Sequence, residues 1–123
     1  MALGAFAAHA LKGRLDPQQL ATFEVGARYQ MYHALALLAV GLLAERLPGG
    51  LLRVSGVLFV TGTLLFSGSL YMLSLSGVRW LGAITPFGGV ALLAGWITLA
   101  AATWERQAPP LSVSGHRESE RQA

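Results

Sequence analysis

The sequence lacks cysteine and is poor in charged residues. Without a thiol the chain has no disulfide framework, no thiolate metal site and no cysteine nucleophile, which excludes several classes of enzyme. Asp, Glu, Lys and Arg make up 12% of the 123 residues, about half of the roughly 25% that an average soluble domain carries. The chain is therefore short of the groups that make a protein surface favourable in water.

The missing charges define two stretches, residues 54–78 and 80–104, each of which runs for 25 residues without Asp, Glu, Lys or Arg. About 20 apolar residues in a helix cross the hydrocarbon core of a bilayer. One charged side chain at its centre costs about 2.5–3.5 kcal/mol on insertion scales. Two such stretches predict an integral membrane protein, in which membrane lipid is a partner of the chain.

The nine basic residues give a formal net charge of +3, but they lie at the ends of the apolar segments and in the C-terminal tail. No basic patch is interleaved with aromatic residues, so we expect no nucleic-acid partner. Lys and Arg at segment ends orient membrane helices, with the excess on the cytoplasmic side. We expect that side to hold Arg46, Arg53, Arg106, Arg117 and Arg121.

Turn residues divide the chain into four predicted helices. Asp16 before Pro17 is a good pair of N-cap and first helical residue, and a Pro-Gly-Gly turn at 48–50 follows the second helix. The first segment is short, because eleven residues at about 1.5 Å each cover half of a hydrocarbon core about 30 Å thick. The sequence predicts an all-α, membrane-embedded four-helix bundle with a shortened first helix. Its domain covers residues 1–106, with helices at about 1–12, 17–46, 51–75 and 79–105, and a polar, disordered tail follows at 107–123.

Pro86 interrupts the fourth segment and leaves two interpretations open. A proline inside a helix removes one hydrogen bond and clashes with the preceding turn, so a helix that starts at Arg79 would be kinked there. Alternatively, Thr85 caps a helix that begins at Pro86, and residues 80–84 approach it along the membrane interface. We favour the kinked helix, because residues 86–104 are only just long enough to cross a bilayer alone.

Small residues are scattered through the third and fourth segments. In lipid, glycine and serine let helices approach closely and pack backbone against backbone. The residues that we expect to pack the helices together are Gly62, Ser67, Gly68, Gly88 and Gly89.

Three stretches carry a resemblance to a known family. They are GAFAAHALKG at residues 4–13, FEVGARYQMYHALALL at 23–38 and LFSGSLYMLSLSGVRWLGAITPFGG at 65–89. In their order and spacing the chain resembles the domain of unknown function 423 family, related to eukaryotic transmembrane protein 256, from its start to about residue 104. The resemblance implies a small multi-pass protein of the bacterial inner membrane with four transmembrane helices, and it implies no reaction. Family members carry a further apolar stretch before the GAF motif, which implies either a start upstream of Met1 or a first helix that is a half-span.

Six polar or aromatic residues gather around the first turn and the second helix. Glu24 with Arg28, and Tyr29 with His33, are four residues apart and lie on common helix faces. An ionisable group such as His33 inside an apolar run needs a partner and is a site hypothesis by default. The functional interpretation makes His9 and His33 a proton relay, a metal pair or a ligand for a quinone or haem. The favoured structural interpretation is a set of hydrogen bonds at the headgroup level, made by the candidate polar cluster His9, Glu24, Arg28, Tyr29, Tyr32 and His33.

No other residues combine into a reactive site. Two histidines with Glu24 as the nearby acid fall short of the three or four ligands of a zinc site. Ser67 and Ser69 have no neighbouring histidine or acid to activate them. We therefore predict no catalytic residue, no metal site and no cofactor, and we do not expect an enzyme.

The first functional hypothesis is a non-enzymatic component of the bacterial inner membrane, either a homo-oligomer or an accessory subunit of a larger complex. It rests on the abundance of packing residues and the scarcity of catalytic ones. The alternative is a small channel or carrier that uses the polar cluster, and one bundle holds too few polar groups to form such a pore without oligomerisation. A membrane enzyme or cofactor carrier is the weakest hypothesis.

Overall fold

The computed structural model describes residues 2–47 and 49–104, and the described chain is built of helices. The elements are α1 (Ala2–Phe6), the π-helix η1 (Ala7–Leu11), α2 (Pro17–Ala44), α3 (Gly50–Ser76), the 3-10 helix η2 (Arg79–Ala83) and α4 (Thr85–Trp104). The predicted all-α fold class is thereby confirmed. The predicted tail at 107–123 and the predicted helix end at 105 lie outside the described residues.

Local chemistry accounts for the ends of the long helices. The Asp16 carboxylate accepts a hydrogen bond from the Gln19 amide at 2.8 Å, and the Gln19 side chain accepts one from the Asp16 amide at 3.2 Å. This capping box satisfies two amides that have no partner within the helix, and Pro17 follows as the first residue of α2. At the far end of α3, Gly77 takes a left-handed conformation with φ +70°, which glycine adopts without steric cost.

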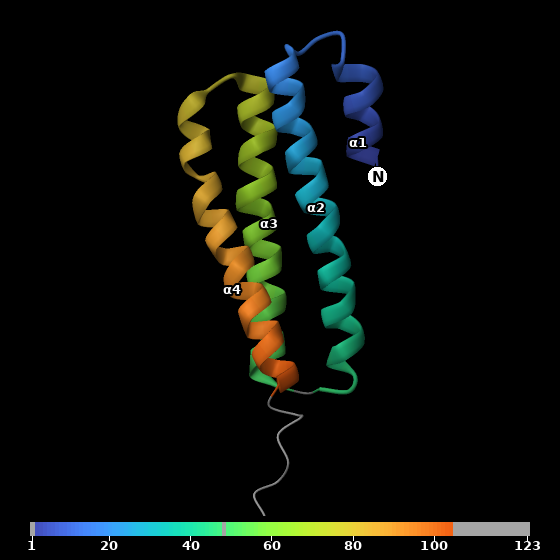
Figure 1. Ribbon diagram of the computed structural model, residues 1–123, viewed down its shortest axis with the longest axis vertical. Helices are drawn as coiled ribbons and strands as arrows, with labels where there is room; N and C mark the ends of the chain where they lie inside the picture. Colours follow the sequence, from blue (N-terminus) through green and yellow to red (C-terminus); the bar gives the residue numbers. More distant parts are fainter. Residues whose placement is uncertain (1, 48, 105–123) are drawn as a thin grey trace, which may run out of the picture.

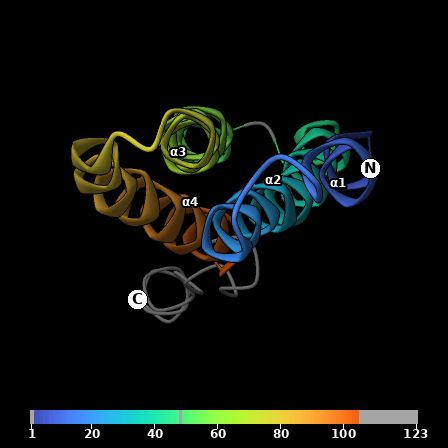
Figure 2. The same ribbon diagram turned by 90° about the horizontal axis from the view of Figure 1, so that it is seen from above.

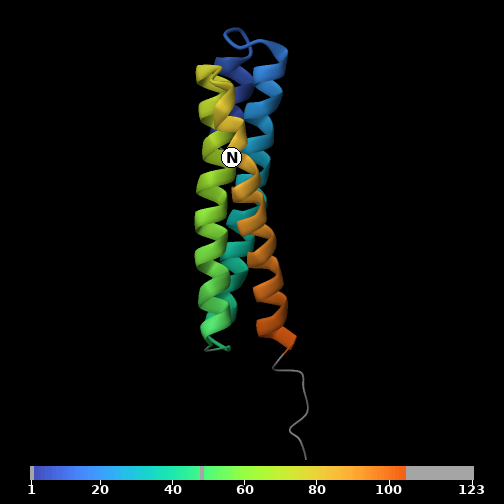
Figure 3. The same cartoon turned by 90° about the vertical axis from the view of Figure 1, so that its left-hand side faces the viewer.

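α2, α3 and α4 lie side by side along most of the molecule, and each runs antiparallel to the next (Figure 1). α3 packs against both α2 and α4. Viewed from above, the three long helices form a triangle, and α1 lies outside it beside α2 (Figure 2). A side view shows the same alignment along the length of the molecule (Figure 3). The helical segment α1–η1 reaches only the upper part of α2, where Leu11 is buried beside Phe23.

The start of the fourth helix differs from the expectation. Residues Arg79–Ala83 form a 3-10 helix, and the α-helix begins at Thr85 with Pro86 in its first turn. Pro86 has no amide proton to donate, and its ring prevents a continuous α-helix through this point. The favoured interpretation, one α-helix from Arg79 with a kink at Pro86, is therefore replaced by a 3-10 helix that leads into α4.

Thr85 does not cap α4 through its side chain in the way that the second interpretation required. Its hydroxyl instead forms a hydrogen bond of 2.8 Å with the Ser69 hydroxyl of α3. The Ile84 carbonyl accepts hydrogen bonds from the backbone amides of Phe87 at 3.1 Å and Gly88 at 3.4 Å. These bonds continue the backbone hydrogen bonding from η2 into α4. Contact with α3 therefore helps to hold this junction.

α3 and α4 pack with their backbones close together. An added Cβ at Gly62 would lie 2.7 Å from Leu92 Cδ2, and one at Gly95 would lie 2.8 Å from Phe59 Cδ1. The approach also allows the buried Ser55 hydroxyl of α3 to donate a hydrogen bond of 2.9 Å to the Gly95 carbonyl of α4. Such close approach is how helices gain packing energy where lipid offers little hydrophobic driving force.

The outer surface of the bundle is apolar. α3 and the segment from Arg79 to Trp104 are long and apolar enough to cross a membrane, yet only 22% of the most apolar window of each is buried in the protein. Large side chains such as Leu64 of α3 and Phe87 and Ile97 of α4 are about 70% exposed. A core helix of a soluble protein buries its apolar residues, so exposure on this scale is typical of helices that face lipid.

Candidate functional site

His33 is the buried titratable group in the centre of the bundle, with only 5% of its surface exposed. Its Nδ1 lies 2.8 Å from the Tyr29 carbonyl, which can only accept, so Nδ1 carries the proton and donates. Its Nε2 lies 3.2 Å from Trp96 Nε1, whose N–H can only donate, so Nε2 accepts. The two partners together define one tautomer of a neutral imidazole, and both nitrogens are used.

Aromatic rings surround this imidazole. The His33 ring centroid lies 5.7 Å from that of Phe59 on α3 and 6.2 Å from that of Trp96 on α4. The Phe59 and Trp96 rings meet edge to face at 5.1 Å, and Tyr29 packs on Phe66 at 4.8 Å. The hydrogen bond that Trp96 donates to His33 therefore connects α4 to α2 within surroundings that offer little else that is polar.

Trp96 is the member of this site that the sequence did not indicate. It lies 63 residues from His33 and is 47% exposed, and its only local signal was an indole N–H within an apolar stretch, a donor that needs an acceptor where water is absent. A similar long-range hydrogen bond joins Tyr71 of α3 to the Gln30 side chain of α2 at 2.6 Å. Sequence spacing identifies neighbours within one helix but not such pairs between helices.

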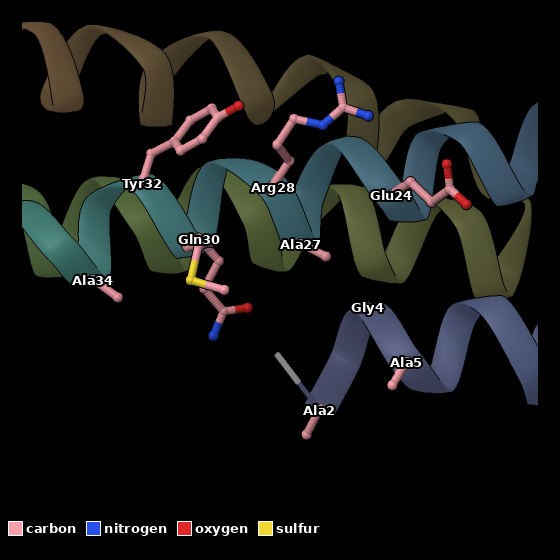
Figure 4. Close-up of a pocket in the computed structure, with 10 residues that line it drawn as sticks. Ala2, Gly4, Ala5, Glu24, Ala27, Arg28, Gln30, Tyr32 and Ala34 are labelled. Carbon is pink, nitrogen blue, oxygen red and sulfur yellow. The ribbon is translucent and has the colours of Figure 1, made fainter.

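The structure divides the candidate polar cluster into three parts. His33 is buried against rings of α3 and α4, and Tyr29, which is 41% exposed, packs on Phe66 of α3. Glu24, Arg28 and Tyr32 are exposed on α2, and the Arg28 and Tyr32 side chains point away from α1 (Figure 4). His9 is exposed on η1. The last residue of η1, Leu11, packs beside Phe23, and Phe23 lies about 15 Å along α2 from His33. The described structure therefore does not bring the two histidines together.

Glu24 and Arg28 are four residues apart on α2, but no ion pair within 4.0 Å joins them in the described structure. No group of three or more His, Asp or Glu side chains in the described ranges could hold a metal ion. Because His33 uses both nitrogens within the bundle, it could ligate a metal or haem only by giving up a partner. The arrangement fits a structural role for His33 better than a reactive one.

Two open grooves run along α2. The first has a volume of about 660 Å³, lies between α2 and α4 over Phe66, and is lined by side chains that include Tyr29, Tyr32, Val90 and Leu93. The second has a volume of about 1000 Å³ and lies between α1 and α2. Glu24 and Arg28 are among the residues that line the second groove, which is shown in Figure 4.

The residues expected to pack helices together occupy different environments. A Cβ at Gly88 would lie 2.8 Å from Phe66 Cα, and closer still to its amide nitrogen, whereas a Cβ at Gly89 would have an ordinary 3.8 Å contact. Gly62 packs on α4 as described above. Ser67 is buried, and its hydroxyl has no hydrogen-bond partner among the described residues. Gly68 has nothing within 4 Å of its Cβ direction, so it points away from the bundle.

Comparison with known proteins gives consistent matches. Residues 3–89 match the family described as "Protein of unknown function (DUF423)". The UPF0382 membrane protein YwdK of Bacillus subtilis is 47% identical over 101 residues, which cover 81% of this chain and 82% of its own. The UPF0382 inner membrane protein YgdD of Escherichia coli is 42% identical over 96 residues, covering 78% of this chain and 73% of its own. No solved structure matches.

Proposed function

Since the chain belongs to the DUF423 family, whose relatives above are membrane proteins, we propose that it is a non-enzymatic component of the bacterial inner membrane. In this proposal it assembles with further copies of itself or as an accessory subunit of a larger complex. Among the residues that the structure describes, no free reactive group lies around His33, which supports a non-enzymatic role. Assembly is supported by the exposed surface of the bundle, which carries small and apolar residues.

The observation that carries the proposal is the outward position of Gly68 on α3. Gly62, Gly88 and Gly95 are used between α3 and α4, but an added Cβ at Gly68 would meet nothing within 4 Å. The side chains around it on the same face, including Leu64, Leu65 and Met72, are exposed. A small residue within an exposed apolar helix face lets a further helix approach closely.

Native purification in mild detergent tests this assembly. We expect the molar mass from light scattering to exceed that of one 13.0 kDa chain, either as a multiple of it or with a co-purifying protein. Gly68→Leu should shift the protein to the monomer, because the leucine side chain prevents close approach of the helices. Gly41→Leu is the matched control, since Gly41 on α2 also has nothing within 4 Å. A wild-type protein that is strictly monomeric and retains no partner would contradict the proposal.

We also propose a multi-pass topology with the α2–α3 turn on the cytoplasmic side. That turn and the last residues of α4 lie at the same end of the bundle, and the η1–α2 and α3–η2 turns lie at the other (Figure 1). Arg46 and Arg53 flank the α2–α3 turn, as the excess of basic residues on cytoplasmic loops would require.

Because the chain has no cysteine, single introduced cysteines report this topology directly. A membrane-impermeant maleimide should label Gly13→Cys in intact spheroplasts, and it should label Glu45→Cys only after the membrane is opened. The two positions lie in turns at opposite ends of α2. The reverse pattern would invert the orientation, and equal labelling of both sites in intact spheroplasts would contradict the multi-pass arrangement.

A further inference from the structure

Two buried hydroxyl oxygens of α3 have no hydrogen-bond partner among the described residues. They are Thr63 Oγ1 and Ser67 Oγ, and Ser67 as a whole is only 2% exposed. A buried hydroxyl without a partner is costly, because it has given up its hydrogen bonds to water and gained none in return. Most buried polar groups in folded proteins have a partner, which can be an ordered water molecule.

The other helical hydroxyls show what serine and threonine ordinarily do in this bundle. In a helix such a hydroxyl can donate to the carbonyl three or four residues earlier. Seven hydroxyls in the described helices do so: Thr22, Thr61, Ser69, Ser74, Ser76, Thr98 and Thr103. Ser55 donates instead to the Gly95 carbonyl of α4. Thr63 and Ser67 differ from these residues, because they make neither kind of bond.

Thr63 lies on the face of α3 that packs against α2. A Cβ at Gly56 of α3 would lie 3.5 Å from Val40 Cγ1, and a Cβ at Gly26 of α2 would lie 3.4 Å from Leu70 Cβ. Thr63 is about two helical turns from both Gly56 and Leu70, so it shares their face.

The same two contacts fix the depth of the unpaired hydroxyls. Halfway between the contacts lie Thr63 on α3 and His33 on α2, so these two residues are level. Thr63 is also the central residue of α3, Gly50–Ser76. α3 is about 40 Å long and the hydrocarbon core is about 30 Å thick. Thr63 and Ser67, one turn further on, therefore lie near the middle of the membrane, where bulk water supplies no partner.

The spacing of the two hydroxyls fits one small molecule between them. Side chains four residues apart lie on one side of a helix, with their Cβ atoms about 5–6 Å apart. Two hydrogen bonds of about 2.8 Å that meet at one oxygen atom span about 4.5–5.5 Å. A single bound oxygen atom can therefore join Thr63 Oγ1 to Ser67 Oγ.

The surroundings favour a neutral molecule over an ion. The part of α2 level with the two hydroxyls, residues 29–33, has no Asp, Glu, Lys or Arg, and neither α3 nor α4 carries one at this level. The next residue of α2, Arg28, is exposed, and His33 uses both of its nitrogens within the bundle. A cation at this depth would have no acidic side chain to offset its charge. A water molecule needs only two to four polar partners.

We propose that one water molecule is bound between α2 and α3 at the centre of the membrane, held by the hydroxyls of Thr63 and Ser67. One hydroxyl donates to the water, and the water donates to the other hydroxyl. The remaining proton of the water can bond to a carbonyl of α3 that neither hydroxyl uses. Together with the hydrogen bond between His33 and Trp96, this water makes the middle of the bundle polar at one level. The site is independent of the proposed assembly through the outward face of α3.

A crystal structure of the full-length protein grown from a lipidic mesophase, at a resolution that shows ordered water, tests the proposal directly. We expect one density peak at about 2.5–3.0 Å from both hydroxyl oxygens. Thr63→Val and Ser67→Ala each remove one hydroxyl, and each should lose the peak. Ser55→Ala is the matched control, because it removes a buried hydroxyl of α3 that already has a partner, and the peak should remain.

Nuclear Overhauser effects between water and the protein in detergent micelles test the same site in solution. We expect a signal from water to the Thr63 methyl group in the wild type and its loss in Ser67→Ala. That variant keeps the Thr63 hydroxyl, so it separates a bound water from exchange of the hydroxyl proton itself. The thermal unfolding midpoint shows whether each variant remains folded. An unchanged Thr63 signal in Ser67→Ala would overturn the proposal, as would a wild-type structure in which both hydroxyls donate to carbonyls of α3 with no density between them.

Discussion

Gly88→Ala is expected to destabilise the bundle by about 3 kcal/mol, at the upper end of the range for overpacking a well-packed interior. The added methyl would lie 2.8 Å from Phe66 Cα and closer to the Phe66 amide. Both of these atoms belong to the backbone of α3, so no side-chain rotation can relieve the overlap. α3 and α4 would have to separate, which would weaken the contacts at Gly62 and Gly95 as well. SDS titration of the protein in mixed micelles measures the change in the free energy of unfolding.

Gly89→Ala is the matched control for this prediction. It adds the same methyl to the same turn of α4, but the new Cβ would have an ordinary 3.8 Å contact with the Phe66 ring. Both substitutions replace glycine by alanine inside a helix, which by itself favours the helix by about 1 kcal/mol. A loss of stability in Gly89→Ala as large as that in Gly88→Ala would show that α3 and α4 do not pack as described.

The second large effect is expected at the hydrogen bond between His33 and Trp96. His33→Ala should cost about 3 kcal/mol, because it removes a buried ring that contacts three aromatic residues and leaves the Trp96 N–H without an acceptor. Trp96→Phe keeps an aromatic ring but leaves His33 Nε2 without a donor, for which we expect a loss of about 1–3 kcal/mol. The same SDS titration measures both losses.

A double-mutant cycle separates the hydrogen bond from general packing. We expect His33→Phe with Trp96→Phe to cost less than the sum of the two single substitutions, because the double variant leaves neither polar atom unpaired. Trp104→Phe is the control for loss of an indole, since Trp104 is 76% exposed and should be replaceable without loss. Additive effects of the two substitutions would contradict a coupling between α2 and α4 at this site.

Features that depend on residue type or on near neighbours could be predicted from the sequence. The two charge-free stretches indicated a lipid environment, because the cost of a charge in hydrocarbon depends on the side chain and hardly on the fold. Asp16 and Pro17 indicated the start of α2, because a capping box is completed within four residues. The need of His33 for a partner followed in the same way from its place in an apolar run.

The sequence could not predict which of several similar small residues lie between the helices. Gly62, Gly68, Gly88 and Gly89 all suit close helix packing, yet Gly88 contacts the backbone of α3, Gly89 only approaches a ring and Gly68 points away from the bundle. A rotation of one helix by one residue would exchange these roles. The composition of the helices is the same under either rotation, so no count of small residues decides between them.

The sequence by itself therefore determined the medium, the helical class and the position at which α2 begins. The tertiary structure decided that Trp96 is the partner of His33, that the polar cluster separates into three parts, and that a 3-10 helix precedes α4. The physical reason is the separation along the chain over which each effect acts, because burial cost, capping and turn formation depend on residues that are close in sequence. The partner of a buried group depends on how whole helices are rotated and aligned against one another.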